Sequence, residues 1–309
     1  DVPSASPGWD PDTVFQATAV GLTPDGTTAL VGVEGFVPDQ GPITDRGALV
    51  TFDAATRRQR AVVELPWQVL GIAVTPDGRR ALLNGGAGYA VVDLAEERLV
   101  GNPTPLAEMR TVDWTEGAEV SPNGRVAALA RNDEVVLVDV ATGGVLRRGQ
   151  VAEEDDRTVQ ALTWSADSTT VVAGSNAGWL HVVSAMTLEP VAPRRLITGG
   201  WVTDLETSPD GRVMASTGFD GDVTLWDTAT WRPYGKPVTD DRGWGWLTFT
   251  PDGKELRVFF EGHEVVEVST DPADWVTAAC AAAGRNLTRE ESPVILPGRA
   301  PSDTCPDEG

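Results

Sequence analysis

Residues 208–227 of this chain, SPDGRVMASTGFDGDVTLWD, decide its fold. The stretch opens with Ser208-Pro209-Asp210-Gly211 and continues into two short apolar runs, the second of which ends at Trp226-Asp227. Proline presets φ for the second position of a turn, and glycine takes the positive φ that closes it. The stretch therefore predicts a tight turn followed by two short strands.

The same turn recurs along the chain at nearly constant spacing. Copies lie at residues 23–26, 75–78, 121–124, 208–211 and 250–253, with a worn copy at 165–168. The proline-equivalent positions are 52, 46, 44, 43 and 42 residues apart. This is the period of a four-stranded propeller blade, about 40 to 45 residues. The pattern predicts an all-β propeller with six blades; seven blades are the alternative, although no seventh turn motif is present.

Residues 208–211 and 218–227 together resemble a near-complete WD repeat, and the likeness extends over about residues 14–270. The other copies are degenerate, since Val92-Asp93 and Val138-Asp139 stand where a WD repeat has Trp-Asp. The resemblance implies a WD-type β-propeller. The Gly-His pair that opens a WD repeat is missing, because the only histidines are His181 and His263. The usual hydrogen-bond relay of these repeats therefore cannot operate here.

The chain divides into a propeller over residues 1–270 and a different tail over residues 271–309. We expect the segment before Val14 to complete the last blade, since no outer strand follows the sixth copy. In the tail, Asp271 is placed to cap a helix that Gly284 ends. We expect this helix and the extended tail to pack on the propeller, with Trp275 as the anchor.

The tail resembles the C-terminal end of actinobacterial WD-repeat proteins. The resemblance lies in residues 271–275, in Ala283-Gly284-Arg285-Asn286-Leu287-Thr288 and in Thr304-Cys305-Pro306. It implies a bacterial signalling protein whose propeller is a sensor or docking part, in many cases fused to an NTPase or protein-kinase module.

The two cysteines, Cys280 and Cys305, both lie in this tail. A bond between them would close a loop of about 25 residues, worth roughly 3 kcal/mol in the chain-entropy model. In a cytosolic protein they would more often be reduced, so the redox compartment decides the pairing. We expect a cytoplasmic protein, with an extracellular location as the alternative if the two cysteines are paired.

Charge and hydropathy limit the possible partners. The chain has 46 acidic and 24 basic residues, a net charge of −22 that repels nucleic-acid phosphates. No apolar run approaches the roughly 20 residues needed to span a bilayer. We therefore expect a protein partner, with no nucleic acid and no membrane insertion.

The sequence contains no recognisable catalytic motif, so we expect neither an enzyme nor a cofactor. The alternative is a calcium-dependent propeller hydrolase or lactonase. Its metal would need carboxylates that converge in the channel, and the candidates beside strands are Glu116, Glu119, Asp204 and Glu206. The acidic run 153–156 is a further candidate for calcium, although a solvated loop is its ordinary interpretation.

Aromatic residues recur seven to nine residues before the turn proline. They are Phe15, Trp67, Trp114, Trp201 and Trp244. In a propeller these connections gather around one mouth of the central channel, and exposed aromatic residues anchor interfaces. The alternative is that each ring packs between blades as core. The ring of aromatic residues therefore predicts the docking site of a non-catalytic interaction scaffold.

Overall fold

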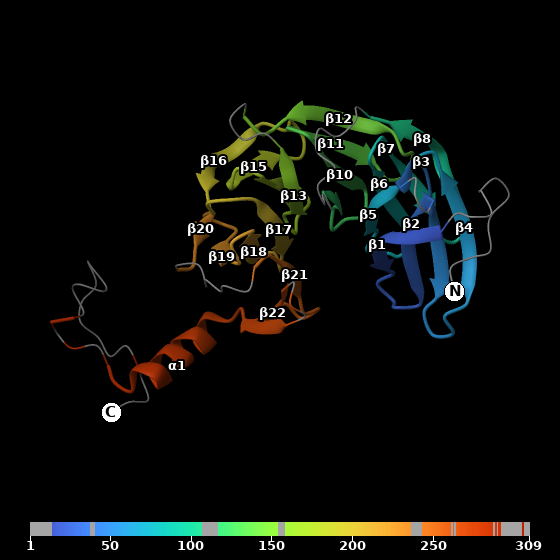
Figure 1. The fold of residues 1–309 in the computed structure, drawn as a ribbon. Helices are drawn as coiled ribbons and strands as arrows, with labels where there is room; N and C mark the ends of the chain where they lie inside the picture. Colours follow the sequence, from blue (N-terminus) through green and yellow to red (C-terminus); the bar gives the residue numbers. More distant parts are fainter. Residues whose placement is uncertain are drawn as a thin grey trace.

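Six antiparallel sheets follow one another along the chain, as the repeat predicts (Figure 1). This computed structural model describes residues 14–37, 41–106, 117–153, 158–235, 243–260 and 264–286, together with 262, 288, 290, 291 and 305. In each of the first five sheets four strands are ordered from the inside outward, and each pairs with its neighbour in sequence. The sixth sheet has three strands.

The strand bounds match the expected repeats. The first sheet contains β1 (Val14–Leu22), β2 (Thr28–Val37), β3 (Gly41–Asp53) and β4 (Gln59–Leu65). The second contains β5 (Val69–Val74), β6 (Arg80–Gly85), β7 (Gly88–Asp93) and β8 (Arg98–Pro105). The third contains β9 (Ala118–Val120), β10 (Val126–Arg131), β11 (Glu134–Asp139) and β12 (Val145–Gln150).

The second half of the chain continues the series. The fourth sheet contains β13 (Val159–Trp164), β14 (Thr170–Ser175), β15 (Trp179–Ser184) and β16 (Pro190–Leu196). The fifth contains β17 (Val202–Thr207), β18 (Val213–Gly218), β19 (Val223–Asp227) and β20 (Arg232–Pro233), and the sixth contains β21 (Gly245–Phe249), β22 (Glu255–Phe260) and β23 (Val265–Ser269).

The repeated tetrapeptide joins the first strand of each sheet to the second. In the first copy the Thr23 hydroxyl donates to the Asp25 carboxylate at 2.6 Å, and the Thr27 backbone N–H donates to the same oxygen at 3.0 Å. Gly26 closes the turn at φ 70°. These donors hold the pKa of Asp25 below its ordinary value. The Asp25 side chain thus accepts the hydrogen bond of a backbone N–H in the turn, that of Thr27.

The core lies between neighbouring sheets. One position recurs in the core, seven residues after the first residue of each turn tetrapeptide. In the first five sheets this residue is fully buried and belongs to an apolar cluster shared with the next sheet. The residues are Leu30, Leu82, Ala128, Val172 and Ala215. Neighbouring sheets also pack through their innermost strands, β1 on β5 and so on to β17 on β21. Each internal sheet is therefore buried on both faces.

The six sheets form an arc whose two end sheets stand apart (Figure 1). Among the described residues, the first and sixth sheets lack the packing that joins every other neighbouring pair. The segment before Val14, expected to complete the last blade, lies outside the described residues, so that expectation stays a prediction.

The tail begins with helix α1 (Pro272–Ala283), as the sequence predicts. The Asp271 side chain accepts a hydrogen bond from the Ala273 N–H, and Gly284 ends the helix in the left-handed conformation. Trp275 is half-buried; its ring lies 5.4 Å from that of Tyr234, and its indole N–H donates to the Ser269 carbonyl at 2.5 Å. Beyond this anchor the helix extends away from the sheets (Figure 1).

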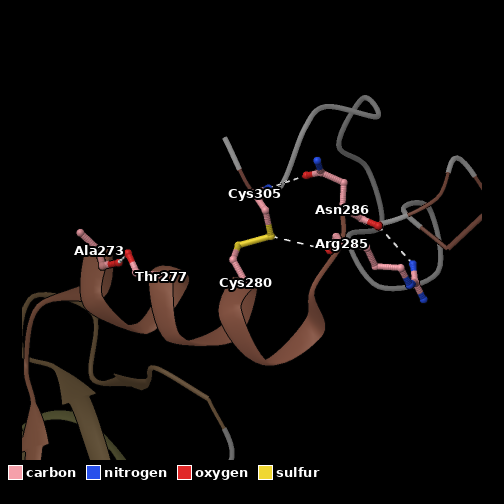
Figure 2. The surroundings of a disulfide bond; sticks show 6 residues. All are labelled: Ala273, Thr277, Cys280, Arg285, Asn286 and Cys305. Carbon is pink, nitrogen blue, oxygen red and sulfur yellow. Dashed lines mark hydrogen bonds between the residues drawn. A yellow bond between two sulfur atoms is a disulfide. The ribbon is translucent and has the colours of Figure 1, made fainter. Parts of the chain in front are cut away.

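The two cysteines form a disulfide that links the end of α1 to Cys305 (Figure 2). The Cys305 backbone N–H donates to the Asn286 side chain at 2.5 Å. Close by, the Arg285 guanidinium forms two hydrogen bonds with the Glu291 carboxylate, at 2.8 and 2.9 Å. The tail is thus cross-linked to itself, while its described residues contact the propeller through the first turns of α1.

Candidate functional site

Two sets of loops meet at one mouth of the propeller. One set precedes the innermost strand of each sheet, and the other joins the second strand to the third. They bond to each other in several sheets: the Leu106 N–H donates to Ala87, the Asn176 N–H to Thr158, and the Phe219 N–H to Trp201, each at 2.9 Å. The aromatic residues singled out by the sequence precede innermost strands, so this mouth is where they would be displayed.

Trp201 and Phe219 form an exposed aromatic pair at this mouth. Their ring centroids are 5.7 Å apart, and 37% and 55% of their surfaces are exposed. The Thr198 hydroxyl bonds to the Asp220 carboxylate at 2.9 Å, which ties together the loops that carry the two rings. The loops are therefore held together by this hydrogen bond, while both rings stay exposed to solvent.

A second aromatic pair follows in the sixth sheet. Trp244 is half-buried, Trp246 is 37% exposed, and their rings meet edge to face with centroids 4.6 Å apart. The Thr217 hydroxyl donates to the Gly245 carbonyl at 3.1 Å, which connects this strand to the fifth sheet. We call Trp201, Phe219, Trp244 and Trp246 the aromatic mouth.

The other three predicted aromatic residues do not join this surface in the described structure. Trp67 is only 4% exposed, because Gly85 and Gly88 have no side chains and its ring fills the space beside them. It is a core residue, contrary to the sequence-based assignment. Phe15 is half-buried against the apolar face of the first sheet. Trp114 lies outside the described residues.

A buried cation connects the second and third sheets at the same mouth. Arg131 is 1% exposed, and its guanidinium donates to the carbonyls of Gly85 and Gly86 at 3.0 and 3.1 Å. Burial lowers the pKa of Arg131 to about 10, and the nearby Arg148 contributes to that shift. The carbonyls take the place of a carboxylate partner, so Arg131 fastens a loop of the second sheet to the end of β10.

Three of the four carboxylates proposed for calcium influence one another. Burial raises the pKa of Glu206 well above its ordinary value, and Glu119 and Asp204 raise it further. The Asp204 carboxylate also accepts hydrogen bonds from the backbone N–H groups of Leu205 and Leu247, at 2.8 and 2.7 Å. The described part of the chain contains no group of three or more residues that could hold a metal ion. Glu116 and residues 154–156 lie outside it.

A hollow of about 590 Å³ lies between the outer parts of the third and fourth sheets, and His181 and Arg194 are among its lining residues. The Arg194 guanidinium lies 4.1 Å from the ring centroid of Trp179 and 3.1 Å from the Glu153 carboxylate. His181 is 6% exposed, in line with the structural role that its place between Leu180 and Val182 suggests. The Arg194 charge in the hollow is thus already bound by Trp179 and Glu153.

Reasoning from the sequence missed Phe219 and Trp246. Phe219 interrupts a Gly-Phe-Asp-Gly turn, where a large apolar residue has no core to enter. Trp246 alternates with the buried Leu247 on one strand, so it must face the opposite side. Both signals were present in the sequence.

Comparison with known proteins agrees with the geometry. Residues 193–227 match the WD domain, G-beta repeat. A curated relative, the U3 small nucleolar RNA-associated protein 18 homolog of Arabidopsis thaliana, is 28% identical over 120 residues. That match covers 38% of this chain and 22% of the relative, so it spans about a fifth of that protein's length.

Two solved structures resemble this fold. Kuenenia stuttgartiensis hydrazine synthase matches 89% of this chain and 80% of its own, with a TM-score of 0.65 and 20% identity. The Myceliophteria thermophila Cps50 (Swd1) β-propeller domain matches 83% of this chain and 85% of its own, with a TM-score of 0.61 and 19% identity. The protein is a β-propeller that contains a WD repeat. No described helix is long and apolar enough to cross a membrane.

Proposed function

We propose that this propeller is a non-catalytic scaffold that binds a protein partner through the aromatic mouth. WD propellers are commonly interaction scaffolds, and the described residues contain no metal cluster. The observation that carries the proposal is the exposure of Trp201 and Phe219 on loops that are otherwise tied down by hydrogen bonds.

The exposed aromatic pairs favour binding for two physical reasons. Large apolar side chains in water gain free energy when a partner covers them, and tryptophan is enriched among residues that dominate binding. The two aromatic pairs occupy neighbouring sheets, so one partner surface would reach both. Their loops are already ordered by the Thr198–Asp220 hydrogen bond, which reduces the entropy lost on binding.

Affinity capture from the source organism tests this assignment. The double variant Trp201→Ala with Phe219→Ala should lose a specific partner, with an affinity at least tenfold weaker, because truncation of such anchors costs about 2 kcal/mol or more. Leu146→Ala with Met186→Ala is the matched control, since both residues are exposed apolar side chains outside the mouth. Equal capture by a folded mouth variant and by the control would refute the site.

We further propose that the protein works in an oxidising compartment, the alternative that the sequence offers for paired cysteines. The Cys280–Cys305 disulfide supports it, because such bonds persist where thiols are not kept reduced. Thiol labelling of the native protein immediately after cell lysis checks the pairing. Two reactive thiols per chain would contradict an oxidising location.

A further inference from the structure

Among the described residues, the sixth sheet has no outer strand like the one that completes each of the other five. Its order is β21-β22-β23, whereas every other sheet has four strands. Among the described residues no strand pairs with the outer edge of β23, so alternate backbone N–H and C=O groups face away from the sheet. An edge of this kind is a template for an added strand.

An apolar row on the outward face leads to this edge. Trp246 is opposite Phe259 on the next strand, and Phe259 is opposite Val265 on β23. Their exposed fractions are 37%, 39% and 49%. Because the row ends on the edge strand, an apolar side chain of an added strand would extend it by one position.

The outward face is not shaped to receive another stacked sheet. Phe259 occupies the position that Gly32 and Gly174 occupy in the first and fourth sheets, counted from their turns. A Cβ atom on either glycine would lie within 2.7 Å of Val69 or Val202 of the next sheet. The second, third and fifth sheets, which are also stacked, carry Asn84, Ala130 and Thr217 there, so every stacked sheet has a residue smaller than phenylalanine at this position. A phenylalanine would hold a stacked sheet away.

Two residues before Phe259, on the same face of β22, a charged residue stands where the other sheets have a buried apolar residue. Arg257 takes the place of Leu30 and its equivalents, and it pairs with Glu267 at 3.1 Å on the exposed face. A stacked sheet would bury this ion pair at a desolvation cost. A strand that pairs sideways with β23 leaves Arg257 and Phe259 where they are.

The surroundings of the edge are acidic. Residues 254–274 contain six acidic and two basic side chains, so the local field favours a cationic strand. Glu267 lies on β23 two residues from Val265, on the same face. If an added strand has an apolar residue beside Val265, its residue two positions along the strand therefore lies beside the Glu267 carboxylate.

We propose that the free edge of β23 binds an extended segment of a partner protein, in which an apolar residue is followed or preceded at two residues by Lys or Arg. The backbone of this segment forms the missing fourth strand. Its apolar side chain continues the row Trp246–Phe259–Val265, and its basic side chain shares the Glu267 carboxylate with Arg257. The site shares only Trp246 with the aromatic mouth.

The sequence of residues 1–13 fits this edge poorly. Residues 1–13 contain prolines at positions 3, 7 and 11, which lack backbone donors, and they contain no Lys or Arg. They would also have to cross from the first sheet to the sixth, which stand apart (Figure 1). The expected closure by this segment is the competing outcome of the test.

A short labelled peptide tests the proposal on the full chain. The probe is acetyl-Thr-Lys-Thr-Val-Thr-Lys-Thr-amide, whose symmetric pattern fits either strand direction. Fluorescence anisotropy should show saturable binding that weakens at least tenfold when Pro replaces Val or Glu replaces both Lys. Phe259→Ser should weaken it similarly. Phe219→Ser, a mouth variant, should leave the binding unchanged, so the test of the β23 edge is independent of the proposed binding at the mouth.

Three results would overturn the proposal. The first is no binding at millimolar peptide. The second is equal binding of the proline peptide, which would reduce the interaction to charge attraction. The third is binding that tightens tenfold or more when residues 1–10 are deleted, because the chain's own segment would then hold the edge.

Discussion

Glu206 shows how a single carboxyl group couples stability to pH in this propeller. Its pKa is raised by burial and by the charges of Glu119 and Asp204, so the ionised form is less favourable in the folded state than in the unfolded state. This difference lowers the free energy of unfolding at any pH above the ordinary pKa of the group. The penalty begins to shrink as the pH falls through the raised pKa of the folded state, and it is gone below the ordinary pKa of the unfolded state.

Glu206→Gln removes the charge and keeps the shape of the side chain. We expect a higher free energy of unfolding at pH 8 than in the unchanged protein, and an advantage that shrinks toward pH 5. Urea unfolding at the two pH values measures it. Glu255→Gln, at an exposed position, is the control. An E206Q protein that is destabilised equally at both pH values would contradict this electrostatic account.

Arg131 is the residue whose loss should most weaken the junction of the second and third sheets. Arg131→Ala removes the two hydrogen bonds to the carbonyls of the buried Gly85 and the half-buried Gly86. We expect a loss of about 2 to 4 kcal/mol in the free energy of unfolding. Arg147→Ala, at an exposed position of the third sheet, should change it by less than about 0.5 kcal/mol. Similar losses in both variants would contradict the assigned role.

At the scale of elements, the turns were predictable because their chemistry is local. Asp25 and Gly26 satisfy and close a turn with residues fewer than four positions away. The fate of Trp67 was not predictable, since its burial depends on glycines about 20 residues later in the chain that happen to lie beside the ring. Sequence periodicity therefore showed which aromatic residues precede innermost strands but could not say which rings are exposed.

Reduction of the disulfide should loosen the tail and leave the stability of the propeller nearly unchanged. The disulfide closes a loop worth roughly 3 kcal/mol, and α1 contacts the sheets only near Trp275. Reduction, or Cys280→Ser with Cys305→Ser, should raise hydrogen exchange in residues 276–291 by at least tenfold. The melting temperature of the propeller should move by less than about 2 °C. A larger shift would mean that the tail supports the propeller more extensively than these contacts indicate.

At the scale of the whole molecule, the repeat explains why five sheet junctions form and the sixth does not. Positions that carry Leu, Ala or Val in the first five sheets carry Arg257 in the last, so the series of apolar junctions ends there. The arc of sheets (Figure 1) thus carries the aromatic mouth and, among the described residues, one unpaired edge on β23. Such surfaces are suited to recognition, and the two lie in adjoining sheets.

The most direct test of the central claim places a photoreactive amino acid on the surface of the protein in its own cell. The positions are Phe219 and Trp246 in the mouth and, as the control, Met186, which is 76% exposed and lies outside it. If a partner docks on the aromatic mouth, both mouth positions cross-link to one and the same protein and position 186 does not. Docking at the mouth is refuted if that protein is cross-linked from position 186 alone, or if neither mouth position cross-links any protein.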